Sequence, residues 1–298
     1  MKKLLRLLEA CALIFLTLPL VFLPMKWALK AGEQIGLFVF SAWKSRRKIA
    51  VENLSKIISA GQIKTSDPAE QIIRANFRNF GRSLAEVIKI YYGFGKPLID
   101  AVVMEGVEHF HTAKEKGKGV IFITGHCGNW ELMALTTGLR FSDVSIVARP
   151  IDNPYLNKFI ERVRKKYGNS IIYKKGALKP IMQTLKKNGI VGILMDQSVL
   201  SNEGYVIDFL GRGAWTTKMP ALLARKTNAP VLPAFIHRTH NGHRMIIHPE
   251  VELSRNEDAE KAVREDTIKF SGFIEGYIKE HPTEWLWIHR RWKRVKEG

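Results

Sequence analysis

The sequence predicts an α/β protein in which a mixed central sheet is flanked by helices, behind an N-terminal membrane-anchoring helical segment. Beyond Gly117, short β-branched and apolar runs alternate with longer helical patterns, as in chains whose strands and helices share one sheet. A long uncharged run and a mostly helical stretch precede them. Apolar residues make up 46% of the chain, which excludes disorder, and two cysteines cannot build a disulfide framework.

The N-terminal run from Ala10 to Met25 contains sixteen residues without a charge. As a helix it covers about 24 Å, less than the roughly 30 Å hydrocarbon thickness of a bilayer, so a span also needs the leucines before it. Pro19 and Pro24 favour a bent or interrupted helix. A cleaved signal peptide and a core helix are the alternatives, but no clean Ala-x-Ala cleavage site follows. We expect a retained anchor over residues 1–30 and one further domain over residues 31–298.

The rest of the chain is predicted element by element. Between Glu33 and Tyr92 the pattern is mostly helical, and Pro68 with Glu70 indicates a helix start after a break. The expected strands are Gly119–Thr124, Val144–Ala148, Ser170–Tyr173, Ile190–Met195, Pro230–His237 and Arg244–His248. The expected helices between and after them are Asn129–Gly138, Pro154–Tyr167, Ala177–Asn188, Thr217–Thr227 and Glu257–Glu280.

The chain is strongly basic. Lysine and arginine outnumber aspartate and glutamate by 47 to 28, so the formal net charge is +19. This excess favours polyanionic partners: nucleic acid, an anionic membrane surface, or an acidic carrier or substrate. More basic residues follow the apolar run than precede it, so the positive-inside tendency places most of the chain on the cytoplasmic face of its membrane.

A histidine turn follows the strand Gly119–Thr124. His126 lies in this turn and Glu131 in the first turn of the next helix. Ligands of open α/β sheets bind beyond the carboxyl ends of strands. The pattern therefore predicts a general base, His126, whose imidazole is oriented by Glu131. In the alternative reading, Asn129 or Glu131 caps the helix and His126 is a surface histidine.

Other kinds of site are disfavoured. The histidines between His237 and His248 lack an accompanying carboxylate or thiolate set, so no metal site is expected. No Gly-x-Ser-x-Gly turn is present for a covalent acyl-serine route. The C-terminal segment that begins at Trp285 mixes tryptophans with basic residues, which suits single-stranded nucleic acid or a membrane interface. The apolar N-terminus favours the membrane, so no nucleic-acid partner is expected.

The motif Gly-His-Cys-Gly-Asn-Trp-Glu at residues 125–131 resembles the His-x4-acid box of membrane glycerolipid acyltransferases. Its Gly-Asn-Trp-Glu form resembles the late acyltransferases of lipid A biosynthesis, of the lauroyl and myristoyl type. Other blocks resemble this family in the same order: Arg46-Arg47 with Asn53-Leu54, Ala148–Pro150 with Asp152–Pro154, Leu194–Ser198, Phe209–Gly211, Thr217–Ala224, Ala229–Pro233 and Glu284–Lys293. Leu210 and Met219 depart from the family pattern. Both lie outside the histidine box, so the departure bears on which acceptor or which acyl-chain length is preferred, and not on the chemistry.

The resemblance implies a glycerolipid acyltransferase-like fold, with residues 31–298 as the catalytic domain, and acyl transfer without a cofactor. His126 would take the proton from an acceptor hydroxyl as it attacks an acyl thioester, with Glu131 as its orienter. Arg149 would contact a lipid phosphate or the developing oxyanion, and an ion pair is its structural alternative. Asp196 would line the same cleft, with a structural cap as its alternative.

Two further residues complete the expected substrate-binding set. Arg164 is a weaker phosphate candidate, and a solvated surface charge is the alternative for it. Asn129 lies within the box itself.

The resemblance also implies the substrates. Acyl carrier protein, or coenzyme A, would donate a fatty acyl chain to a hydroxyl of a phosphorylated glycolipid, a lipid A precursor of lipopolysaccharide biosynthesis, at the inner membrane. The charge of +19 suits acidic acyl carrier protein, lipid phosphates and an anionic membrane surface. The alternatives are another acceptor, such as a phosphatidylinositol mannoside or a lysophospholipid, and a non-catalytic basic membrane adaptor.

Overall fold

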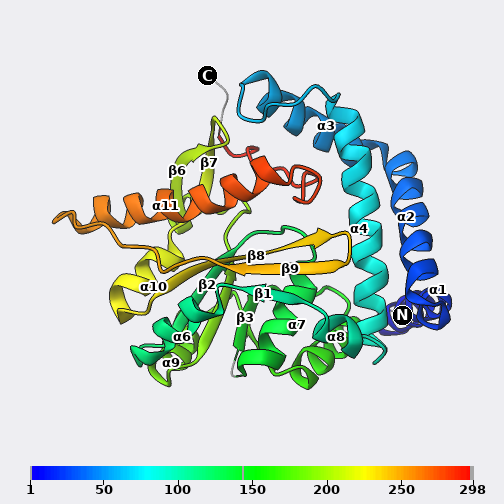
Figure 1. The fold of residues 1–298 in the computed structure, drawn as a ribbon, viewed down its shortest axis with the longest axis horizontal. Helices are drawn as coiled ribbons and strands as arrows, with labels where there is room; N and C mark the ends of the chain where they lie inside the picture. Colours follow the sequence, from blue (N-terminus) through cyan, green and yellow to red (C-terminus); the bar gives the residue numbers. More distant parts are fainter. Residues whose placement is uncertain (1, 143, 296–298) are drawn as a thin grey trace.

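A seven-stranded sheet in the order β1-β9-β8-β2-β5-β3-β4 forms the centre of the computed structural model, which describes residues 2–142 and 144–295 (Figure 1). Its strands are β1 (Val103–Glu105), β2 (Val120–Thr124), β3 (Val144–Ala148), β4 (Asn169–Tyr173), β5 (Ile190–Leu194), β8 (Val231–Thr239) and β9 (Gly242–Ile247). Neighbouring strands are parallel, except that β8 and β9 form an antiparallel pair. The predicted mixed central sheet is therefore confirmed.

Helices surround the sheet. They are α1 (Lys2–Phe22), α2 (Met25–Ala42), α3 (Lys44–Ser59), α4 (Ala69–Tyr91), α5 (Lys96–Asp100), α6 (Val107–Glu115), α7 (Trp130–Phe141), α8 (Pro154–Lys166), α9 (Leu178–Lys186), α10 (Met219–Thr227) and α11 (Ala259–Glu280), with a short 3₁₀ turn at Ser201–Glu203. A separate antiparallel hairpin, β6 (Gly204–Phe209) and β7 (Arg212–Thr217), lies outside the main sheet. β1 and this hairpin were not predicted from the sequence.

Both faces of the central strands are buried, which explains why the sequences of these strands are nearly continuous apolar runs. Along β2, Ile121 and Ile123 belong to the hydrophobic cluster that includes residues of α9, α10 and α11. Val120 and Phe122 point the other way, into a second cluster that includes residues of α5, α6 and α7. Alternate side chains of one strand thus contribute to two cores.

The register of β2 and β5 positions the residues that follow these two strands. The strands are parallel, and Thr124 pairs with Leu194 at their carboxyl ends. His126 and Asp196 each come two residues after these partners. Because parallel strands end at the same edge of a sheet, the two side chains begin on neighbouring strands at the same level.

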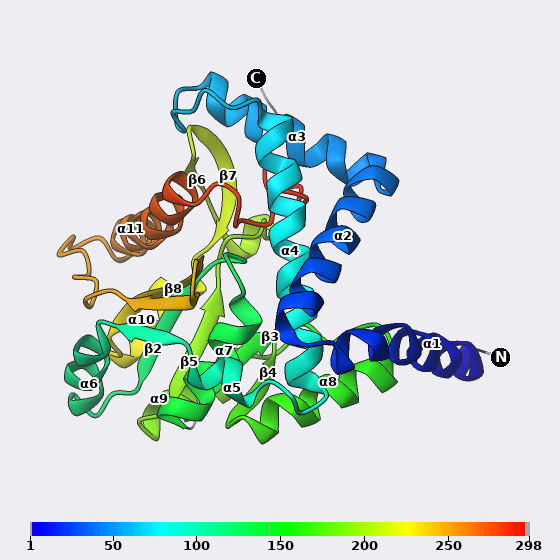
Figure 2. The same cartoon turned by 45° about the vertical axis from the view of Figure 1, so that its right-hand side comes forward.

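The N-terminal helices lie against one side of the α/β body. Figure 2 shows α2 and α4 side by side, and α1 projecting beside α8. Within the described residues, one helix is long and apolar enough to cross a membrane, Lys3–Phe22, and 17% of its most apolar window is buried. α1 ends before Pro24, which is the N-cap of α2, so the predicted interruption falls between the two helices. An apolar N-terminal helix of this kind is consistent with membrane association.

The expectation that the C-terminal tryptophans face a membrane is wrong. Trp285 and Trp287 are 0% exposed and Trp292 is 6% exposed. All three belong to the larger hydrophobic cluster, where their rings contact one another and Phe209. Burying such large rings removes far more apolar area from water than an interfacial position would.

Candidate active site

The imidazole of His126 contacts Asp196. Nδ1 of His126 lies 2.8 Å from Oδ1 of Asp196, and the backbone N–H of His126 donates to Oδ2 at 3.0 Å. Asp196 is 2% exposed, whereas the His126 side chain is 22% exposed, so one group is buried and the other can reach a substrate. The Trp130 ring lies edge-on to the imidazole, with 5.3 Å between the ring centroids.

Asp196 is ionised at neutral pH. Burial alone would raise the pKa of its carboxyl group, but the contacts with His126 and the N–H of Trp285 hold this pKa well below its usual range. An ionised carboxylate accepts hydrogen bonds only, so His126 must donate from Nδ1. The Nε2 atom is then unprotonated and can act as a base; it accepts a hydrogen bond from the side-chain amide of Gln197 at 3.4 Å.

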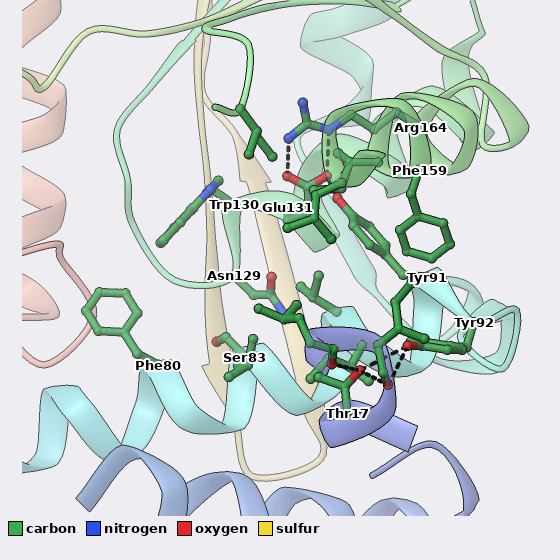
Figure 3. Close-up of a pocket in the computed structure, with 18 of the residues that line it drawn as sticks. Thr17, Phe80, Ser83, Tyr91, Tyr92, Asn129, Trp130, Glu131, Phe159 and Arg164 are labelled. Atoms are coloured by element: carbon green, nitrogen blue, oxygen red, sulfur yellow. Dashed lines mark hydrogen bonds and ion pairs between the residues drawn. The ribbon is translucent and has the colours of Figure 1, made fainter. Parts of the chain in front are cut away.

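The predicted contact between His126 and Glu131 is corrected by the structure, because Glu131 binds Arg164 instead (Figure 3). Nε and a terminal nitrogen of Arg164 donate to the two carboxylate oxygens at 2.8 and 2.7 Å, and the Tyr91 hydroxyl donates to one of them at 2.6 Å. Among the described residues, no hydrogen bond joins Glu131 to His126. Asp196 takes the place predicted for Glu131, since strand register brings it to the imidazole.

Asn129 has a structural position. Its side-chain oxygen accepts the backbone N–H of Leu132 at 3.1 Å and so caps α7. Its amide nitrogen donates at 2.8 Å to Glu86, which is also bound by Arg238. Burial would raise the pKa of Glu86, but His243 and Arg238 lower it to about 2. The Asn129 amide is therefore held by an ionised, buried carboxylate that is also paired with Arg238. Both polar atoms of the Asn129 side chain are therefore taken up by protein groups.

Arg149 lies just beyond β3 and is exposed. It lines a cavity of about 270 Å³ whose wall mixes apolar side chains with the polar groups of His126, Glu131, Arg164 and Lys174; because of these groups we call it the polar cavity. In the part of the chain that the structure describes, no hydrogen bond or ion pair holds the guanidinium of Arg149. Three positive side chains, Arg149, Arg164 and Lys174, thus line the cavity that His126 also lines; Arg164 is paired with Glu131 and Lys174 with Glu203.

A second, apolar cavity of about 450 Å³ lies between α1, α4 and α8 (Figure 3). Its wall is formed mainly by aliphatic and aromatic side chains, including Ile14, Val87, Tyr92 and Phe159. Trp130, Glu131 and Arg164 line both cavities. These three residues therefore form a wall common to the two spaces, one suited to an alkyl chain and the other to a polar, anionic group.

Within residues 2–142 and 144–295, no cluster of three or more histidine, cysteine, aspartate or glutamate side chains is arranged to hold a metal ion.

The chain resembles proteins that attach acyl groups to lipids. Residues 2–294 match a family described as bacterial lipid A biosynthesis acyltransferase. A lipid A biosynthesis acyltransferase of Haemophilus influenzae is 24% identical, covering 96% of this chain and 87% of the relative. A lipid A biosynthesis palmitoleoyltransferase of Escherichia coli is 25% identical, covering 90% and 85%. A phosphatidylinositol mannoside acyltransferase of Mycobacterium tuberculosis is 22% identical, covering 81% and 75%.

Proposed function

This chain belongs to the family of bacterial lipid A biosynthesis acyltransferases, and we propose that it moves a fatty acyl chain from acyl carrier protein onto a hydroxyl of a phosphorylated glycolipid precursor of lipid A. It is an acyltransferase of groups other than aminoacyl groups. The reaction takes place on the cytoplasmic face of the inner membrane and needs no cofactor. The main support is that His126 lines one cavity whose wall, through Trp130, Glu131 and Arg164, is shared with an apolar cavity.

His126 acts as the general base. Its Nε2 atom removes the proton of the acceptor hydroxyl as that oxygen attacks the thioester carbonyl carbon, and Asp196 stabilises the resulting imidazolium. The tetrahedral intermediate expels the thiolate, which takes the proton back from the imidazolium. Because a hydroxyl has a pKa far above 7, a positioned base contributes about 10²–10⁴ in rate.

The two cavities divide the substrates between them. The acyl chain occupies the space between α1, α4 and α8, where its methylene groups are removed from water. The sugar and phosphate of the acceptor occupy the polar cavity, where Arg149 binds a phosphate. Glu131 and Arg164 form part of the wall between the two cavities, since they line both of them.

Charge and the N-terminal helix support the location. α1 is long and apolar enough to cross a membrane, which supports a position beside the membrane, where the acceptor lipid lies. The net charge of +19 attracts acyl carrier protein, the lipid phosphates and the anionic membrane surface. Basic residues near an anionic bilayer surface contribute about 1 kcal/mol each to this attraction.

The test uses the full-length protein in lipid nanodiscs with acyl-carrier-protein thioesters and a phosphorylated disaccharide lipid A precursor. Mass spectrometry of the lipid should show one added acyl chain. His126→Ala should lower kcat at least about 10²-fold. His240→Ala is the matched control, because His240 lies exposed between β8 and β9 and should leave the rate unchanged.

Each outcome bears on one part of the proposal. Normal transfer by folded His126→Ala protein would overturn the assignment of the base. Acylation of a phosphatidylinositol mannoside or a lysophospholipid, but not of the disaccharide, would replace the acceptor and leave the chemistry intact. A wild-type protein that acylates none of these lipids from either acyl carrier protein or coenzyme A would contradict the enzymatic proposal.

A further inference from the structure

The segment after α11 pairs with the His126 turn like an additional short strand. The backbone N–H of Gly128 donates to the carbonyl of Glu284 at 2.8 Å, and that of Leu286 donates to the carbonyl of His126 at 3.2 Å. Between them, Cys127 and Trp285 form an antiparallel bridge. The C-terminal segment thus holds the backbone on both sides of Cys127.

The side chain of Trp285 reaches the catalytic carboxylate itself. Its indole Nε1 donates at 2.8 Å to Oδ2 of Asp196, the same oxygen that accepts the backbone N–H of His126. The other oxygen, Oδ1, faces Nδ1 of His126. An indole N–H can only donate, so this contact holds one orientation of the carboxylate.

An aromatic cluster fixes the position of the indole. Trp285 is 0% exposed, and its ring lies against Trp287 at 4.7 Å, Phe209 at 5.7 Å and Trp292 at 6.1 Å, measured between ring centroids. A ring packed on several sides has little freedom to turn its N–H away from Asp196.

We propose that Trp285 is a positioning residue for acyl transfer: its indole N–H holds the Asp196 carboxylate in the orientation that keeps the proton on His126 Nδ1 and leaves Nε2 free as the base. This inference rests on the proposed function, because it assigns a role in the same proton transfer. It gives the C-terminal tryptophan motif a role in the buried interior, in place of the membrane contact predicted from the sequence.

Without the indole N–H, Oδ2 keeps the backbone N–H of His126 as its remaining donor. The Asp196 carboxylate is then less firmly oriented toward Nδ1 and stabilises the imidazolium less, which changes both the rate and its pH dependence. The other titratable groups that act electrostatically with Asp196 are Cys127, His289 and Arg291. Within the described residues, none of these three donates a hydrogen bond to the Asp196 carboxylate.

The test compares Trp285→Phe with Trp287→Phe in the full-length enzyme. Trp287 is an adjacent, equally buried tryptophan whose Nε1 donates at 2.7 Å to the carbonyl of Pro282, away from Asp196. Trp285→Phe should lower kcat about 10- to 100-fold with KM for both substrates unchanged, and should move the acid limb of the kcat–pH profile to lower pH, because the imidazolium is less stabilised. Trp287→Phe keeps an aromatic ring against Trp285 and removes only a hydrogen bond to Pro282, so kcat and the profile should stay within about twofold of wild type.

Two further measurements separate positioning from folding. In the Asp196→Asn background, Trp285→Phe should add little further loss, since the two residues act as one unit. Nitrogen-15 spectra of labelled histidine should show the Nδ1–H tautomer of His126 in wild type and Trp287→Phe, and an increased Nε2–H population in Trp285→Phe. These spectra need no substrate, so they test the inference even if the protein acylates a different lipid.

The inference is overturned if the two phenylalanine variants behave alike, or if Trp285→Phe changes only the unfolding temperature. An unchanged His126 tautomer in Trp285→Phe would overturn it as well. Absence of lipid A acylation by the wild type, together with a tautomer change in Trp285→Phe, would contradict the proposed function and leave the positioning role standing.

Discussion

Asp196 and Glu131 are carboxylates with different partners, although both lie near His126. Asp196 accepts from His126 and Trp285, whereas Glu131 is bound by Arg164 and Tyr91. Glu131 is close to His126 along the chain, but Asp196 reaches it through the pairing of β2 with β5. At the scale of single residues, sheet register therefore outweighs sequence proximity in choosing the partner of the imidazole.

Arg149 provides a test of substrate charge at the same scale. A bidentate arginine–phosphate contact is planar and two-pronged, and a lysine cannot reproduce it. Arg149→Lys should therefore raise KM for the phosphorylated acceptor and leave kcat unchanged, because a ground-state contact is lost. Loss of an oxyanion contact would instead lower kcat. Steady-state kinetics with varied acceptor concentration distinguish the two roles.

The control for this prediction is Arg162→Lys. Arg162 is exposed on α8 and lines neither of the two cavities. If Arg149→Lys and Arg149→Ala both match wild type in kcat and KM, Arg149 does not contact the substrate.

Among the elements, α1 is bound to the rest of the protein along most of its length. Side chains of the body bind its backbone carbonyls at three levels: Asn153 binds that of Arg6 at 2.7 Å, Tyr92 that of Ile14 at 3.1 Å and Lys89 that of Val21 at 2.7 Å. Leu13, Ile14 and Thr17 of α1 line the apolar cavity. The N-terminal helix is therefore also a wall of the space proposed for the acyl chain.

This position predicts that α1 influences chain length. Ile14→Trp places a larger side chain in the apolar cavity, so the enzyme should select shorter acyl chains than wild type does. Phe15→Trp is the control, because Phe15 is 73% exposed and does not line the cavity. The measurement is competition among donors of mixed chain length, followed by mass spectrometry of the product lipid. An identical chain-length profile in Ile14→Trp would place the acyl chain elsewhere.

At the scale of the whole molecule, half-buried histidines contribute to how stability responds to acid. Burial lowers the pKa of His237, His248 and His289, in the last case to about 4. An unfolded histidine has a pKa near 6.5. Below that value the unfolded chain binds more protons than the folded protein, so stability falls as the pH decreases.

The unfolding temperature should therefore fall between pH 7 and pH 5. In this window Glu86, whose pKa is lowered to about 2, stays ionised in the folded protein and adds its loss only at lower pH. Replacing His289 by asparagine should reduce the slope, because one site of differential protonation is removed. Calorimetry at several pH values gives the result, and a flat unfolding temperature across this range contradicts it.

Much of the fold follows from local patterns. Strand β2, the start of α7 and the position of His126 between them were predicted, since periodicity, propensity and turn chemistry act over a few residues. The β6–β7 hairpin was missed, because its turn places Leu210 and Gly211 at positive φ without the usual Asn-Gly signal. A leucine in a left-handed conformation depends on the surrounding packing, which local propensity does not report.

The sequence by itself determined the α/β class, the basic charge and the histidine turn, because each depends on composition or on neighbours along the chain. Only the tertiary structure decided that Asp196 partners His126, that Trp285 binds Asp196 and that α1 lines the apolar cavity. The first two contacts join residues 70 and 89 positions apart. They form because strand order, register and helix packing bring distant segments together, and a linear pattern does not contain that geometry.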